Sequence, residues 1–184
     1  KVGFSPSYIL LDIKPNGVSG TCLLHPLHKN KFSTIDDIYD HVLNRVCVLY
    51  AGIAAEVQWY SEYTSYNHDQ TNANNIYLNG LMDNTGLNDG AKIDELLYIL
   101  NGIKKEPCSN PEVISNQHNE IRTVAWGSVC KHLHDNTTLI TMGKMLTEHY
   151  HLKKQDKTNN YHGYHHKYKF DGAYISEIFN SLLT

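Results

Sequence analysis

The chain has 184 residues, of which 41% are hydrophobic, and a formal net charge of -3 at pH 7. This length and composition fit a single domain, residues 1–184, with a sizeable core. The charge balance gives no basic signature, so it does not indicate nucleic-acid binding, and the absence of an apolar run of about 18 residues predicts no membrane-spanning segment.

The N-terminal part predicts a small β-hairpin or sheet. Tyr8–Lys14 and Val18–Leu24 read as strands, and Pro15, Asn16 and Gly17 between them form a turn signal. A loop then leads to Ser33 or Thr34, either of which can act as the N-cap of a helix.

The stretch from Thr34 to Tyr66 predicts a long helix at the centre of the fold. Its segment Val46–Val57 has a single charge, Glu56, and is apolar all round, which predicts burial on more than one side. The small residues in that segment predict close approach by a neighbouring backbone. The expected inward residues of the helix are Ile35, Ile38, Val42, Leu49, Ile53, Val57 and Tyr60. The small residues are Ala51, Gly52 and Ala55.

The remaining chain predicts further helices separated by turns and one polar loop. Periodicity and caps place the helices within His68–Met82 and over Lys92–Ile103, Pro111–His134, Leu139–Leu152 and Tyr174–Leu183. Asn110 is the expected cap before Pro111, and the helices on either side of Asp135–Asn136 are expected to pair antiparallel. Residues 153–170 are expected to be a polar loop rich in His and Tyr. The fold class is therefore mainly α: a helical bundle around a central buried helix, with a small N-terminal sheet.

The four cysteines include no C-x-x-C pair, so we expect reduced thiols and a cytoplasmic protein. Three of them lie in apolar surroundings, which predicts buried side chains. The four cysteines of the chain are Cys22, Cys47, Cys108 and Cys130.

Several catalytic and binding motifs are missing from the sequence. It contains no H-E-x-x-H, no G-x-S-x-G and no phosphate-binding G-x-x-x-x-G-K-[ST], so no catalytic residue is identified and ATP binding is not expected. The pairs His132/His134 and His149/His151 point to different sides of a helix and are poor chelates. The tail residues His162, His165 and His166 could hold zinc or nickel on an adaptable loop, although an ordinary polar surface loop is the favoured interpretation.

Four segments, taken in order, resemble the peptidase domain of FtsH-type ATP-dependent zinc metalloproteases and their small stand-alone relatives. Leu11–Gly20 resembles the family's strand and turn, and Ala51–Glu56 matches its A-G-x-A-A-E helix closely. Gly90–Asp94 resembles the G-A-x-x-D segment that carries a zinc ligand, and Ile121–Leu152 resembles the closing helical pair. The family's H-E-x-x-H helix would fall just before Lys1.

The resemblance implies a set of site residues, each with a simpler alternative. Asp94 would be a zinc ligand, with Asp69 as its rival, or an acid favoured by the helix dipole. Glu56 would orient a site residue, or be a surface carboxylate. The edge formed by Gly17, Val18, Ser19 and Gly20 would hold an extended substrate by backbone pairing, or be a plain hairpin.

Two functions follow from the resemblance. The first is a metallopeptidase that hydrolyses peptide bonds with zinc-activated water, zinc being the expected cofactor. The second is a non-catalytic module of the same fold that binds a peptide or a protein partner. A weaker third interpretation is a metal- or pH-responsive protein that uses the tail segment 161–168. The sequence predicts neither the substrate nor the oligomeric state.

Overall fold

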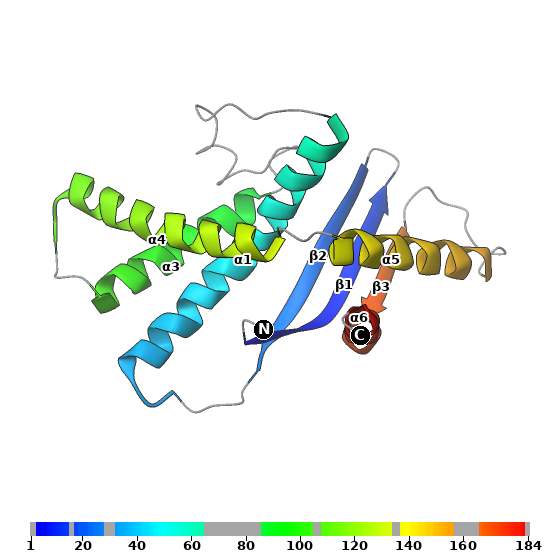
Figure 1. The fold of residues 1–184 in the computed structure, drawn as a ribbon, viewed down its shortest axis with the longest axis horizontal. Helices are drawn as coiled ribbons and strands as arrows, with labels where there is room; N and C mark the ends of the chain where they lie inside the picture. The colour runs from blue at the N-terminus through cyan, green and yellow to red at the C-terminus, as the bar shows by residue number, and fades with distance from the viewer. Residues whose placement is uncertain are drawn as a thin grey trace. The chain divides into compact units, whose positions relative to one another are not determined.

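The computed structural model describes residues 3–14, 17–27, 32–64, 86–104, 108–133, 137–156 and 166–182. Figure 1 shows a mainly helical chain with one small antiparallel sheet, which confirms the predicted fold class. The chain divides into two compact units. We call Gly3–Lys29 with Asp135–Thr184 the sheet unit, and Asn30–His134 the helical unit. The elements are β1 (Phe4–Lys14), β2 (Gly17–Pro26), α1 (Ile35–Thr64), α3 (Leu87–Lys104), α4 (Pro111–Leu133), α5 (Thr137–Asp156), β3 (His166–Asp171) and α6 (Gly172–Ser181).

The sheet unit contains three strands in the order β2-β1-β3, with both neighbours antiparallel to β1. The predicted hairpin is therefore present, and both of its strands extend beyond their predicted ends. The prediction of a loop over 153–170 is wrong at both ends, because α5 continues to Asp156 and β3 begins at His166. Alternating Lys and aromatic residues in β3 suit a strand that is buried on one face only. Residues 157–165 of that segment lie outside the described residues.

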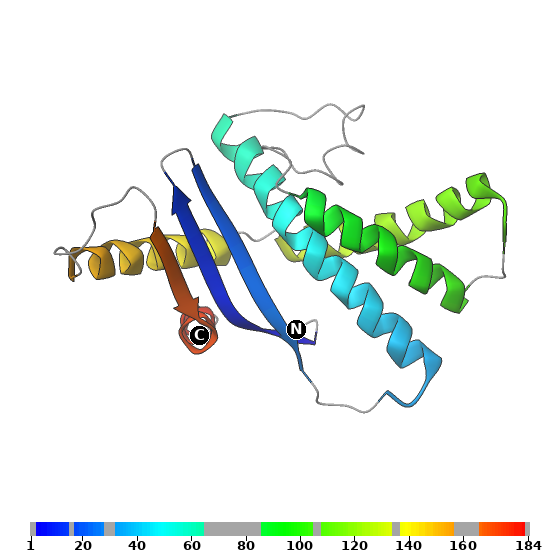
Figure 2. The same ribbon diagram turned by 180° about the vertical axis from the view of Figure 1, so that it is seen from behind.

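One face of this sheet is packed with aromatic rings. Phe170 pairs with Ile9 and Tyr168 with Leu11, so these four side chains share a face. The ring of His149 on α5 lies 6.1 Å from Phe170 and 4.3 Å from Tyr174 of α6. Figure 2 shows β3 leading directly into α6. Helix α6 therefore packs on β1 and β3, and the ring of His149 from α5 joins the rings on this face.

The helical unit is built on α1, which packs against both α3 and α4 (Figure 2). Thr34 caps α1: its hydroxyl accepts from Asp37 N at 3.1 Å, while the Asp37 carboxylate accepts from Thr34 N at 2.8 Å. The Asp37 carboxylate accepts hydrogen bonds from Ser33 N and from Thr34 N, and these lower the pKa of Asp37. The buried core is formed by Val46, Cys47, Leu49, Tyr50, Ile53, Ala54, Val57, Ile93, Leu97, Leu100, Ile121, Ala125 and Val129.

Helix boundaries in the helical unit follow local sequence signals. Asn110 Oδ1 accepts from Glu112 N at 3.0 Å, so the predicted cap before Pro111 is confirmed. The helix predicted from Lys92 begins earlier, at Leu87. The helix expected within His68–Met82 lies outside the described residues. The two helices that were expected to pair antiparallel on either side of Asp135–Asn136 belong to different units. Helix α4 is in the helical unit and α5 is in the sheet unit.

Three predictions about burial are wrong. Ile35 and Ile38 are 58% and 39% exposed, because they lie in the first turns of α1, and its buried residues begin only at Val46. Gly52 and Ala55 are also exposed, and a Cβ added at Gly52 would meet no atom of the described residues within 4 Å, so no described backbone approaches there. Of the cysteines only Cys47 is buried, while Cys22, Cys108 and Cys130 are exposed.

Candidate functional site

Asp94, the carboxylate expected to bind zinc, lies on α3 and is paired with a cation. Arg122 Nη2 on α4 donates to Asp94 Oδ1 at 2.5 Å, and Arg122 Nη1 donates to Asn119 Oδ1 at 3.0 Å. The side chains of Arg122 and Asp94 are 26% and 48% exposed. An ion pair this exposed contributes about 0.2–1 kcal/mol to stability. The Asp94 carboxylate therefore forms an ion pair that joins α3 to α4.

His118 lies one turn before Arg122 on α4. It is a buried polar residue at the contact between α3 and α4, with 6% exposure. Its ring stands edge-on to Tyr98 of α3, with centroids 4.6 Å apart. Among the described residues, His118 Nε2 and Arg122 Nε are buried without a hydrogen-bond partner. Burial, and then the charge of Arg122, lower the pKa of His118, while Asp94 acts in the opposite direction.

Acidification is therefore expected to weaken the contact between α3 and α4. The folded pKa of His118 lies below its unfolded value near 6.5, so the unfolded chain binds more protons once the pH falls below that value. Stability is therefore lost as the pH falls from about 6.5 to the folded pKa of His118. Urea unfolding measured from roughly pH 7.5 to pH 5 tests this.

The matched variant for that titration is His118→Phe, which keeps a ring beside Tyr98 and removes the titrating group. Its unfolding free energy is expected to fall less than that of the wild type on acidification, since the two proteins differ only at residue 118. If the unfolding free energies of the two proteins fall equally on acidification, His118 does not cause the loss of stability.

The other expected metal and site residues are only partly among the described residues. Glu56 is half-buried on α1, and Asp69 lies outside the described residues. Of the tail histidines, His162 and His165 also lie outside them, and His166 begins β3. Throughout the described ranges, no three His, Cys, Asp or Glu side chains are grouped so that they could hold a metal ion.

The expected substrate strand is in the sheet unit, whereas Asp94 and Glu56 are in the helical unit. Gly17, Val18, Ser19 and Gly20 pair with Lys14, Ile13, Asp12 and Leu11, in that order. Because β2 is the first strand in the sheet order, its other edge pairs with no described strand. The backbone N–H and C=O groups along the edge of a sheet can receive a further strand.

The two edges of the sheet differ in charge. β2 has ten residues, GVSGTCLLHP, none of them Asp, Glu, Lys or Arg. β3, at the opposite edge, carries Lys167, Lys169 and Asp171. Lys169 Nζ also lies 4.7 Å from the centre of the Tyr8 ring. Charged residues, and lysine above all, are the usual protection of an edge strand against pairing, so β3 has this protection and β2 lacks it.

Two parts of this arrangement were missed by sequence reasoning. His118 and Arg122 read as ordinary polar positions of an amphipathic helix; their spacing of one turn from Ile121 and Ala125 was the only available signal. The status of β2 as an edge depends on β3, which is far away in the sequence. Composition of β2 alone could not distinguish an edge strand from a central one.

No protein-family model, curated protein or solved structure matches this chain. The resemblance to FtsH-type peptidases therefore rests on the sequence segments alone and stays a prediction. In the part of the chain that the structure describes, no helix is long and apolar enough to cross a membrane.

Proposed function

We propose that this chain is a non-catalytic binding module that holds an extended segment of a partner protein along the outer edge of β2. The observation that carries the proposal is the uncharged ten-residue edge strand, placed opposite an edge that does carry lysines. Added strands gain affinity from main-chain hydrogen bonds, which an edge strand such as β2 can supply.

The preferred segment follows from the side chains of β2. Cys22 and Gly20 are on the same face as Phe170 and Tyr168, because they pair with the same β1 residues, Ile9 and Leu11. That face is packed with rings, so apolar residues of an added strand would extend it. Ser19 and Thr21 point to the other face. The partner segment should alternate apolar and polar residues and carry few charges.

Hydrolysis of the bound segment by zinc is the competing proposal, and it comes from the family resemblance. The position of β2 at a sheet edge also suits a peptidase substrate strand. The pairing of Asp94 with Arg122 favours binding without hydrolysis, since a guanidinium cation occupies the carboxylate that would have to bind the metal.

The test uses a displayed library of random linear peptides and adjacent proline substitutions, Ser19→Pro and Gly20→Pro. Successive N–H groups of a strand point to opposite edges, so one proline removes a donor to β1 and the other a donor to the partner. One variant should lose stability. The other should keep its Tm and bind the selected peptides at least about tenfold more weakly, as the loss of about 1.4 kcal/mol or more implies.

Gly20→Ala is the matched control, because an added Cβ would lie 3.8 Å from Leu11 Cδ2, an ordinary contact. It should bind as the wild type does. If the proline variant that keeps its Tm binds peptides normally, β2 is not the binding edge. Mass spectrometry of the peptides after incubation with zinc separates the proposals: intact peptides support binding alone, and cleaved peptides support a peptidase.

A further inference from the structure

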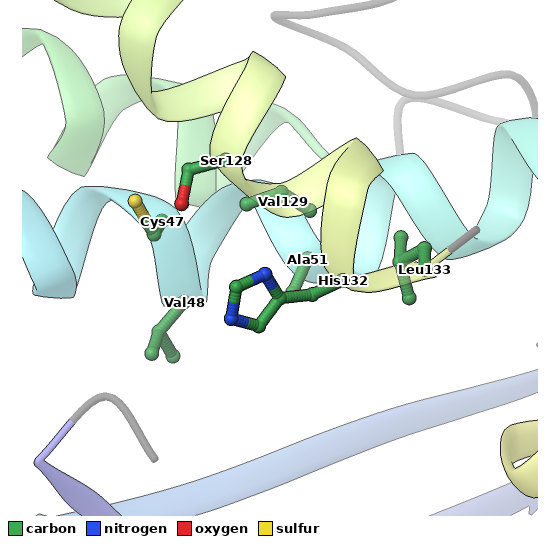
Figure 3. Close-up of a pocket in the computed structure, with 7 residues that line it drawn as sticks. All are labelled: Cys47, Val48, Ala51, Ser128, Val129, His132 and Leu133. Atoms are coloured by element: carbon green, nitrogen blue, oxygen red, sulfur yellow. The ribbon is translucent and has the colours of Figure 1, made fainter. Parts of the chain in front are cut away.

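A cavity of about 150 Å³ lies between α1 and α4, in the helical unit. Its lining residues are Cys47, Val48 and Ala51 from α1, and Ser128, Val129, His132 and Leu133 from α4. Figure 3 shows these two sets of side chains on facing helices, with the Ser128 hydroxyl directed toward α1 beside Cys47. All of these residues belong to one compact unit, and none is near β2 in the sequence.

The cavity has an apolar interior and a polar mouth. Cys47 and Val129 are 8% and 6% exposed, whereas Ser128 and His132 are exposed. The thiol of Cys47 lies 3.8 Å from the carbonyl oxygen of Ala125. Burial raises the pKa of this thiol, although a hydrogen bond with Ser128 acts in the opposite direction. Cys47 therefore stays protonated near neutral pH and behaves as an apolar wall.

Size and lining together define what the cavity can hold. An apolar cavity of about 150 Å³ is large enough for a single aromatic ring. Pockets for small molecules combine such an apolar body with a few polar groups that fix orientation. Here those groups are the Ser128 hydroxyl and the His132 ring, both at the mouth.

We propose that the cavity between α1 and α4 is a binding site for a small aromatic molecule with one hydroxyl group, of the phenol class. The ring contacts Val48, Ala51 and Val129, and the hydroxyl faces Ser128 and His132. This site is separate from the β2 edge, so it does not depend on the proposed function.

Phenol and benzene are the probes, added to the full chain in thermal unfolding. Phenol at about ten times its Kd should raise Tm by roughly 3–6 °C. Benzene, which lacks the hydroxyl, should bind at least about threefold more weakly. Equal binding of the two probes would overturn the role given to Ser128 and His132, and no saturable shift with either would overturn the site.

Substitutions on one helix at a time provide the controls. Ala51→Leu fills the cavity and should abolish the phenol shift, while Ala55→Leu, one turn along at an exposed position outside the cavity, should keep it. Ser128→Ala should remove the preference for phenol over benzene, and Ser115→Ala, exposed on the same helix, should not. A shift that persists in Ala51→Leu would place phenol elsewhere and contradict the proposal.

A second measurement keeps the proposal testable if Ala51→Leu does not fold. In the wild type, saturating phenol should slow alkylation of Cys47 by iodoacetamide at least about fivefold, because the ligand covers the thiol. Cys22, Cys108 and Cys130 are exposed and serve as internal controls in the same digest. Equal slowing of all four, or of none, would overturn the site.

Discussion

Gly172→Ala is expected to destabilise the sheet unit by about 1–3 kcal/mol, although the same change in a helix usually stabilises. Gly172 is the first residue of α6 and is buried. An added Cβ would lie 2.7 Å from the carbonyl oxygen of Ser7 and in overlap with that of Pro6. Both atoms belong to the backbone of β1, where the register with β2 shifts between Pro6 and Tyr8. This overlap can therefore be removed only if β1 or α6 moves.

Gly143→Ala is the matched control, in α5 of the same unit. A Cβ there would meet no atom within 4 Å, and Gly143 is exposed. Alanine should stabilise α5 by up to about 1 kcal/mol, because it restricts the unfolded chain and favours helix. Hydrogen exchange followed by mass spectrometry resolves peptides of the sheet unit and measures both effects. A stabilising Gly172→Ala, or two changes of the same sign, would contradict the close approach of α6 to β1.

Leu97→Ala is expected to lower the free energy of unfolding of the helical unit by about 2–5 kcal/mol. Leu97 is 0% exposed and lies on α3 among the core residues that α1 and α4 contribute. Truncation removes buried methyl groups and leaves a cavity that three packed helices can close only in part. Urea unfolding monitored by circular dichroism measures the loss, through a lower midpoint with an unchanged slope.

Leu87→Ala makes the identical chemical change at the start of the same helix, where the side chain is 54% exposed. Its effect should stay within about 0.5 kcal/mol. If the two alanine variants unfold at the same urea concentration, α3 is not packed through Leu97 as described.

Local signals explain which parts of the fold could be predicted. Thr34 with Asp37, and Asn110 before Pro111, cap α1 and α4 through hydrogen bonds within four residues. Ile93, Leu97 and Leu100 follow the helical periodicity of α3, and all three are buried. Burial of the first turn of α1 was predicted wrongly at Ile35, because periodicity identifies an apolar face and does not show whether a neighbour covers it.

The candidate site was predicted in part. Ser19 and Gly20 were identified as a strand that could receive an extended segment, and they do lie at a sheet edge. Asp94 was expected to bind zinc on the strength of the preceding Gly90–Ala91. Its partner Arg122 is 28 residues away on another helix, and no local pattern predicts that pairing.

By itself, the sequence determined the helical class, the caps, the main core positions of α1, α3 and α4 and the hairpin of β1 and β2, since these depend on contacts or periodicity within one element. Only the tertiary structure decided that β3 completes the sheet and leaves β2 as its uncharged edge. It also decided that Asp94 faces Arg122, that His118 is buried and that α1 and α4 enclose a cavity. The physical reason is the same in each case: these features join residues far apart in the chain, and their energies exist only after the elements have packed.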